Sequence, residues 1–495
     1  MGRLDFQEWS NNMGYMNLSL SAIHNAIINN EVTPLELVKE ALLLAKNDDN
    51  NAFEYICEKE ALTAVKKLDP SKRGNLLYGI PVVIKDNLAT KDIPTTASSN
   101  MLNGYVPVYS GEVVLRLENE GAIIIGKTTM DELAMGGSGI TGHRGVTFNP
   151  WDKSKTRIVG GSSCGSAAAM SAGIVPIAIG SDTGDSVRKP ASYSGTVGFK
   201  PTWGRISRFG LFPFASSLDH VGYFTRNVFD SAYLLNVLAG RDDKDSSSSF
   251  KEVEDYTKNI NESIKGKKIA VIKNVVDSIS NKTIIEAFNK TMEFLRSEGA
   301  VVDVIEMNNH LLEAINPTYF IIANAESMSN NANLDGIKFG TRKEAKEYTD
   351  IIMRTRSECF SSHIKRRFVI GSFSMLTENQ NELFIKAQKC RRMIVDAFNK
   401  VFEDYDVIYC PASPNIAPLI KKGKDALFTD NSIADNILAF GNLGGYPSIT
   451  LPIGFSENLP FGGNLTAKPF EEAKLFQVAN AIEKHTGLAN LVARK

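Results

Sequence analysis

Cysteine and histidine are scarce in this sequence, and neither residue forms a recognisable cluster. The 495 residues include five cysteines and six histidines. Scattered thiols in odd number argue for reduced cysteines rather than a disulfide framework, and no Cys-x-x-Cys pair or Cys/His cluster indicates a metal site. Each histidine stands alone, so none is an obvious catalytic base. We therefore expect no metal and no other cofactor in this chain.

Long apolar runs and a large excess of either charge are also missing. The sequence has no stretch of about eighteen consecutive apolar residues, which argues against a membrane span. The formal net charge is −1 and no basic tract stands out, so direct contact with nucleic acid is not indicated. Residues 1–16 carry Asp5 and Glu8 and lack an apolar core, unlike a signal peptide. We expect a cytoplasmic protein.

Short apolar segments alternate with helical patterns through most of the chain. Strands are expected at 81–84, 122–125, 175–179, 268–272, 301–305, 407–409 and 448–451. Most of these segments are continuously apolar, which is typical of strands covered on both faces. Helices are expected at 113–120, 163–172, 282–298 and 381–402. The pattern predicts an α/β fold built on a large, mostly buried sheet.

We expect residues 1–495 to form a single domain. Its N-terminal part, about 17–70, is predicted to be helical, and Thr33 to Glu36 form a capping box with proline at the first helical position. Residues 241–262 are rich in Asp, Ser, Lys and Asn, which predicts a polar surface loop. This loop could separate two units, but strands on both sides of it can join one sheet.

The strongest local signal lies at residues 160–200, where small residues are far more frequent than usual. A strand, a tight turn and a possible helix start follow one another there. Backbone N–H groups from Thr183 to Ser186 can converge on one point and hold an oxyanion, and the Ser186 hydroxyl would be aimed at that point. Phosphate-loop, dinucleotide and GxSxG motifs are absent. Composition alone leaves both a catalytic site and close structural packing open.

A nucleophilic serine needs a base, and Lys85 directly follows the apolar segment 81–84. Burial penalises the charged ammonium group, so the pKa of this lysine should fall and its neutral amine could act as the base. The alternative is a structural lysine paired with Asp86 or Asp182.

Three motifs, taken in order, resemble the amidase signature family: GIPVVIKDN at 79–87, GGSSCGS at 160–166 and GSDTGDSVRKP at 180–190. The resemblance implies the amidase signature fold, in which helices cover both faces of a large mixed β-sheet. Residues 75–235 would form the signature core of that fold. The resemblance also implies amidase activity.

The family uses a Ser-cisSer-Lys triad. Carried over by position, Lys85 matches the lysine, Ser162 the bridging serine and Ser186 the nucleophile. The oxyanion loop of the family matches Thr183, Gly184, Asp185 and the N–H group of Ser186.

Further motifs are similar to one branch of the family, the A subunits of glutamyl-tRNA(Gln)/aspartyl-tRNA(Asn) amidotransferases. These motifs lie at 130–138, 200–232, 325–340 and 365–373. Such a subunit hydrolyses glutamine and sends ammonia to a B subunit, which uses ATP and Mg to activate a misacylated tRNA and then amidates it. A small C subunit ties the two together. The resemblance therefore implies B and C subunits as partners, with tRNA bound mainly by the partner.

The resemblance also implies residues for the charged ends of glutamine. Arg367 matches the substrate arginine, whose planar guanidinium suits an α-carboxylate, and Asp435 matches the substrate aspartate, which suits an α-ammonium group. Tyr319 matches the substrate tyrosine. Arg366 is the alternative to Arg367, and a solvated helix face is the alternative role for both arginines. Core packing is the alternative role for Tyr319.

Two positions depart from the family's usual motifs. Cys164 replaces a glycine and is expected to pack, and Asp185 replaces the glycine immediately before Ser186. Asp185 keeps its backbone N–H group, but its carboxylate would oppose a developing oxyanion unless Arg188 or Lys189 pairs with it. Glycine could be required there for a positive φ, a region that aspartate tolerates better than most residues.

Two other functions remain as alternatives. A stand-alone amidase for other carboxamides would leave the charges of Arg367 and Asp435 without partners. A catalytically silent scaffold is favoured only by Asp185. Asn464 and Thr466 also depart from the usual motif, which bears on contacts with glutamine. The sequence does not distinguish glutamine from asparagine as the donor, or Glu-tRNA(Gln) from Asp-tRNA(Asn) as the acceptor.

Overall fold

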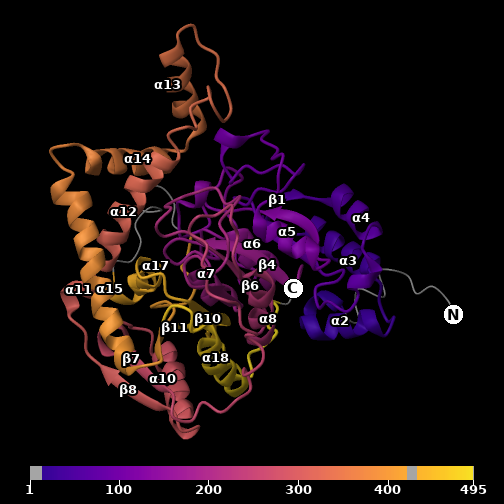
Figure 1. The fold of residues 1–495 in the computed structure, drawn as a ribbon, viewed down its shortest axis with the longest axis vertical. Helices are drawn as coiled ribbons and strands as arrows, with labels where there is room; N and C mark the ends of the chain where they lie inside the picture. Colours follow the sequence, from indigo (N-terminus) through magenta and orange to yellow (C-terminus); the bar gives the residue numbers. More distant parts are fainter. Residues whose placement is uncertain (1–13, 421–431, 494–495) are drawn as a thin grey trace.

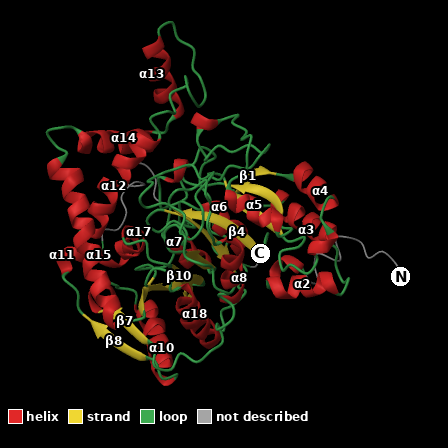
Figure 2. Cartoon of the chain, viewed as in Figure 1, coloured by secondary structure: helices red, strands yellow, loops and turns green. Residues whose placement is uncertain are grey.

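A mixed β-sheet runs through the computed structural model, which describes residues 14–420 and 432–493. The strands are Phe53–Ile56 (β1), Pro81–Lys85 (β2), Ile123–Thr128 (β3), Ile177–Asp182 (β4), Val197–Lys200 (β5), His220–Thr225 (β6), Lys268–Ile272 (β7), Val301–Ile305 (β8), Val407–Pro411 (β9), Ser448–Ser456 (β10) and Leu459–Ala467 (β11). Within the described residues the sheet has 11 strands in the order β1-β3-β2-β4-β6-β5-β10-β11-β9-β7-β8. Figure 2 shows helices surrounding these strands.

Parallel pairing occurs towards the two ends of the sheet. Strand β2 runs parallel to β3 and β4, and β7 runs parallel to β8 and β9. The other neighbouring strands are antiparallel. The sheet is therefore mixed, as the resemblance implied.

The central strands are buried along their whole length. Every residue of β2, β3, β4, β5, β6, β9 and β11 is buried. A strand buried at both odd and even positions must be covered on both faces, because successive side chains point to opposite faces. The predicted α/β fold with a large covered sheet is confirmed.

Helices account for most of the rest of the described chain (Figure 1). They are Leu20–Ile28 (α2), Pro34–Lys46 (α3), Glu58–Lys66 (α4), Glu112–Asn119 (α5), Cys164–Ser171 (α6), Arg188–Ser194 (α7), Val228–Leu238 (α8), Lys273–Asp277 (α9), Lys282–Ser297 (α10), Asn309–Glu313 (α11), Ile315–Asn330 (α12), Tyr348–Cys359 (α13), Ser362–Met375 (α14), Lys386–Asp404 (α15), Ile433–Asn436 (α16), Phe440–Leu443 (α17) and Glu472–Thr486 (α18). A π-helical turn, Asn381–Ile385, precedes α15. Helix α13 lies on an arm that extends away from the rest of the molecule (Figure 1). No helix of the described ranges combines the length and the apolar character that a bilayer crossing requires.

Most of the expected elements are present, and their boundaries follow the expected chemistry. Thr33 caps α3: the Glu36 N–H group donates to its Oγ1 at 3.3 Å, and its own N–H group donates to Glu36 Oε2 at 2.8 Å. Helix α6 ends before Gly173, whose φ of +71° favours glycine. Four strands were not predicted, namely β1, β5, β6 and β11. Of these, β1 lies inside the N-terminal segment that was expected to be helical.

The predicted polar loop has neither helix nor strand, since α8 ends at Leu238 and β7 begins at Lys268. The expectation that it lies on the surface is only partly right. Tyr256 is 1% exposed, and its hydroxyl accepts a hydrogen bond from Arg205 Nε at 2.7 Å. Asp245, 9% exposed, accepts from the Arg208 N–H group at 2.8 Å. The loop is polar because its side chains bind neighbouring backbone and arginine groups, and not only because it meets water.

Candidate active site

Lys85 is the last residue of β2 and is fully buried. Its Nζ atom donates to three serine hydroxyls: Ser162 Oγ at 2.7 Å, Ser163 Oγ at 2.9 Å and Ser181 Oγ at 2.9 Å. Ser163 and Ser181 did not figure in the predicted site, although both lie within its motifs. The ammonium group is therefore surrounded by hydroxyl groups and not by carboxylates.

The structural alternative for Lys85 fails because both of its proposed partners are engaged elsewhere. Asp86 lies 3.6 Å from Nζ of Lys127, and Asp182 forms a buried ion pair with Arg188. Burial without an adjacent carboxylate penalises the charged amine. It lowers the pKa of Lys85 from 10.5 to about 7, so a large share of the amine is neutral near neutral pH.

Ser162 lies in a loop that is built around the carboxylate of Asp131. The Gly161–Ser162 peptide bond is cis. The Asp131 N–H group donates to Ser162 O at 3.2 Å, and Gly161 N donates to Gly137 O at 2.9 Å. The Asp131 carboxylate accepts backbone N–H bonds from Ser138, Gly139, Ile140 and Thr141. Asp131 thus ties the 137–141 loop to the predicted bridging serine, a connection that the sequence motif did not reveal.

Ser186 lies just before α7, beside the same pair of serines. The Ser163 N–H group donates to Ser186 O at 3.2 Å, and Ser186 is 4% exposed. Among the described residues, the Ser186 hydroxyl has no hydrogen-bond partner, and no bond joins it to the Ser162 hydroxyl. The structure brings Lys85 and Ser162 into contact and places Ser186 next to them. The hydrogen bonds of a proton-transfer chain are often completed only when substrate is present.

A buried ion pair supports the turn that precedes Ser186. Arg188 is fully buried, and its Nη2 lies 3.0 Å from Asp182 Oδ1 and 2.7 Å from Gly184 O. Asn442 Nδ2 also donates to Asp182 Oδ1 at 3.0 Å. Burial opposes ionisation of Asp182, but the Arg188 guanidinium outweighs it and holds the pKa of this carboxyl group well below its usual range. Arg188 therefore fixes the loop from beneath, a role that sequence reasoning missed.

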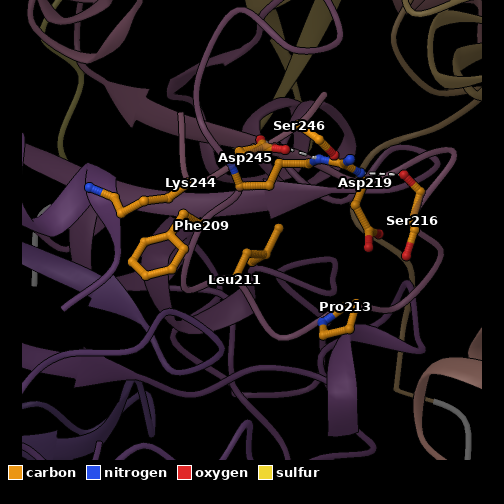
Figure 3. A pocket seen from close by; sticks show the side chains of 9 residues that line it. Phe209, Leu211, Pro213, Ser216, Asp219, Lys244, Asp245 and Ser246 are labelled. Carbon is orange, nitrogen blue, oxygen red and sulfur yellow. Dashed lines mark hydrogen bonds and ion pairs between the residues drawn. The ribbon is translucent and has the colours of Figure 1, made fainter. Parts of the chain in front are cut away.

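Thr183 is held at the other side of the same turn. Its Oγ1 donates to Asp219 Oδ1 at 2.7 Å. Burial raises the pKa of Asp219 to about 6. Asp219 also lines a cavity of about 230 Å³, and the side chains around that cavity are drawn in Figure 3. One carboxylate thus belongs to both the cavity lining and the predicted oxyanion loop.

Asp185 pairs with Lys189, which is one of its two proposed partners. Lys189 Nζ lies 2.9 Å from Asp185 Oδ2 and 3.1 Å from Asp435 Oδ1. Arg188, the other proposed partner, binds Asp182 instead. Asp185 does not have a positive φ, so this position does not require glycine for its backbone conformation. The carboxylate before Ser186 is therefore paired, and the lysine that pairs with it also contacts the predicted substrate aspartate.

Tyr319 of α12 lies against the turn. A Cβ atom added at Gly184 would lie 2.8 Å from Tyr319 Cζ and 3.1 Å from its hydroxyl oxygen. Such a separation is well below an ordinary carbon–carbon contact. Glycine at 184 is therefore required for the close approach of this tyrosine, and Tyr319 reaches the predicted oxyanion loop instead of packing only in the core.

The two candidate arginines of α14 differ in their surroundings. Arg366 is exposed. Arg367 is half-buried, its Nη1 donates to Asn324 Oδ1 at 3.2 Å, and its guanidinium lies 5.3 Å from the ring centroid of Phe320. Burial lowers the pKa of Arg367, with nearby Tyr319 opposing the change. Arg367 therefore faces the Tyr319 side of the site, whereas Arg366 faces water.

Cys164 packs as expected. It is 1% exposed, and its Sγ accepts a hydrogen bond from Thr147 Oγ1 at 3.4 Å. Burial raises the pKa of its thiol to about 12, so the reactive thiolate is scarce at neutral pH. Within residues 14–420 and 432–493, no group of three or more His, Cys, Asp or Glu side chains is arranged to hold a metal ion.

Comparison with known proteins follows from this geometry. The family model described as amidase matches residues 36–476. The A subunit of the glutamyl-tRNA(Gln) amidotransferase of Pediococcus pentosaceus is 40% identical over 480 residues, which cover 96% of this chain and 98% of that protein. The protein of the same name from Staphylococcus haemolyticus is 40% identical over 486 residues, covering 95% and 97%.

Solved structures agree with the sequence comparisons. The crystal structure of the glutamyl-tRNA(Gln) amidotransferase A subunit from Thermotoga maritima has a TM-score of 0.78 and 34% sequence identity, and 96% of each chain is covered. The structure of a peptide amidase from Stenotrophomonas maltophilia has a TM-score of 0.77 and 25% identity, with 95% of this chain and 97% of that chain covered.

Proposed function

This chain belongs to the amidase family, and on that premise we propose that it is the glutamine-hydrolysing A subunit of a tRNA-dependent amidotransferase. Relatives about 40% identical over almost the whole chain carry that name. The single structural observation that carries the proposal is the buried Lys85 amine, 2.7 Å from Ser162 Oγ and without an adjacent carboxylate. Such an amine can accept a proton at neutral pH, which a serine nucleophile requires.

The proposed chemistry is acyl transfer from the side-chain amide of glutamine. Neutral Lys85 takes a proton from the Ser162 hydroxyl as Ser162 takes one from Ser186, and Ser186 Oγ bonds to the amide carbon. The negative oxygen of the tetrahedral intermediate is held by backbone N–H groups of Thr183, Gly184, Asp185 and Ser186. Losing a single donor of this kind costs about 3 kcal/mol.

The proton then returns along the same chain to the amide nitrogen. The carbon–nitrogen bond breaks, ammonia leaves, and a glutamyl ester remains on Ser186. Water next attacks the ester, with Lys85 and Ser162 again taking and returning the proton. Glutamate is released and the Ser186 hydroxyl is restored.

The charged ends of glutamine are assigned to the residues around this nucleophile. Arg367 binds the α-carboxylate, because a half-buried guanidinium next to Tyr319 offers two parallel N–H donors. Arg366 is too exposed for that role. Asp435 and its neighbours attract the α-ammonium group, and Tyr319 contacts the substrate over Gly184.

The remaining partners follow from the same proposal. Ammonia passes to a B subunit, which binds ATP and Mg and amidates Glu-tRNA(Gln), and possible use of Asp-tRNA(Asn) belongs to that partner. A C subunit completes the complex, tRNA is bound mainly by the B subunit, and the complex works in the cytoplasm. A stand-alone amidase and a silent scaffold are less well supported, because the relatives named above are amidotransferase A subunits and Asp185 is paired with Lys189.

The proposal is tested by ammonia release from glutamine by the complex co-purified with its B and C subunits, with and without ATP and misacylated tRNA. Glutamine-dependent release that increases when ATP and Glu-tRNA(Gln) are added is expected. Rapid cleavage of simple amides together with no release from glutamine would favour the stand-alone amidase instead.

A further inference from the structure

Lys189 occupies the position at which the proposed function puts the substrate's α-ammonium group. Its Nζ lies 3.1 Å from Asp435 Oδ1 and 2.6 Å from Asp435 O. The lysine side chain is 10% exposed and that of Asp435 is 11% exposed. An internal ammonium group so placed neutralises the aspartate on which a substrate ammonium group would depend.

Asp185 supplies the charge that this contact removes. Its Oδ2 lies 2.9 Å from the same Nζ atom, so the lysine is shared between two carboxylates. With all three groups ionised, Asp185, Lys189 and Asp435 carry one net negative charge; without Asp185 their charges would cancel. The adjacent ion pair of Arg188 and Asp182 adds no net charge.

The position of Asp185 fits an electrostatic role better than a packing role. Its side chain is 24% exposed, more than that of Lys189 or Asp435, and it immediately precedes Ser186. Its backbone does not have a positive φ, so nothing in the main chain selects aspartate or glycine. The side chain meets the lysine, and the charge of the site is what it changes.

We propose that Asp185 is a specificity-determining residue: by pairing with Lys189, it leaves one net negative charge beside Ser186 to attract the ammonium group of an α-amino acid amide. The inference rests on the proposed glutaminase function. Asp185 and Lys189 act as a unit, because each compensates the charge of the other at the Asp435 subsite.

The test compares two substrates in the complex with B and C subunits. One is glutamine, and the other is 4-carbamoylbutanoate, which has the same chain and carboxamide but no α-amino group. The variants are Asp185→Asn, which keeps the shape and removes the charge, Lys189→Gln, and the double variant. Values of kcat and KM for ammonia release are measured for each pair.

Asp185→Asn is expected to raise KM for glutamine by about tenfold or more, the factor that ~1.4 kcal/mol of lost attraction produces. It should leave KM for 4-carbamoylbutanoate unchanged or lower. Lys189→Gln alone should not raise KM for glutamine, and the double variant should restore it towards the wild-type value. A purely structural role of Asp185 would change both substrates alike.

The inference is overturned if the wild-type complex hydrolyses glutamine and Asp185→Asn leaves the ratio of kcat/KM for the two substrates unchanged. It is also overturned if Lys189→Gln does not reverse the effect of Asp185→Asn. Failure of the proposed function has a different signature, because the wild-type complex would then release no ammonia from glutamine.

Discussion

The pH dependence of ammonia release is determined by the protonation of Lys85. The neutral amine is the form that accepts a proton, so the rate must fall as the pH drops through the pKa of about 7. About half of the amine is neutral at pH 7, about nine tenths at pH 8 and about one tenth at pH 6. We therefore expect an acid limb of kcat/KM near pH 7.

The size of this effect follows from burial. Lys85 is fully buried, and lowering its pKa from 10.5 to about 7 corresponds to a penalty of about 5 kcal/mol on the ammonium form. An ordinary lysine would be neutral in only about one molecule in three thousand at pH 7. Between pH 7 and 10.5 the unfolded chain binds the proton that the folded chain has lost, so Lys85 also makes the free energy of unfolding rise with pH in that interval.

The assay is ammonia release from glutamine by the complex between pH 5.5 and 9, values chosen to lie about 1.5 to 2 on either side of the pKa. Lys85→Arg serves as the matched variant, because arginine remains charged throughout that range and cannot take up a proton. It should abolish release at every pH. Asp219→Asn is the control, because Asp219 has a raised pKa of about 6 and contacts Thr183.

Three outcomes would refute the reasoning. A flat profile across the acid range would mean that no group with a pKa near 7 controls the reaction. Release by Lys85→Arg near the wild-type rate would show that the amine is not the base. An acid limb that disappears in Asp219→Asn would assign the titration to that carboxyl group.

Three further predictions concern the site. Arg367→Lys should raise KM for glutamine by about tenfold to a hundredfold, because it loses the bidentate contact, whereas Arg366→Lys should not; equal effects would contradict the choice between them. Gly184→Ala should lower kcat/KM by on the order of ten- to a hundredfold, because its Cβ would lie 2.8 Å from Tyr319 Cζ; the control Gly74→Ala, with no atom within 4 Å, should be silent in steady-state kinetics. Asp182→Asn should lower the free energy of unfolding by about 3–5 kcal/mol, because it leaves Arg188 buried and uncompensated, and a thermal unfolding midpoint equal to that of the wild type would contradict this.

Continuous apolar segments carried most of the fold prediction. The expected segment 81–84 became β2, and 268–272 became β7 with the same bounds. Strands β5 and β11 escaped notice, because the first has the mixed sequence VGFK and the second contains Pro460 and two glycines. Their strand conformation is imposed by pairing with β6, β9 and β10 and not by local preference.

The site divides in a similar way. Ser162 and Ser186 lie in one short segment, and Lys85 ends a strand that pairs with the strand before Ser186, so their proximity could be predicted. The contact of Lys189 with Asp435 joins residues 246 positions apart, and no local pattern indicates it. The support that Asn442 gives to Asp182 is equally non-local. Charges that compensate one another across the fold were therefore the part that sequence reasoning could not supply.

The central claim is that Ser186 is the nucleophile that takes the glutamyl group from glutamine. The most direct measurement is acid quenching of the complex during turnover of glutamine, followed by mass spectrometry of the peptide that contains Ser186. A glutamyl ester on Ser186 is expected, and it should be absent from Ser186→Ala, which should also release no ammonia. Turnover of glutamine by Ser186→Ala, or a glutamyl adduct on another residue such as Cys164, would contradict the account.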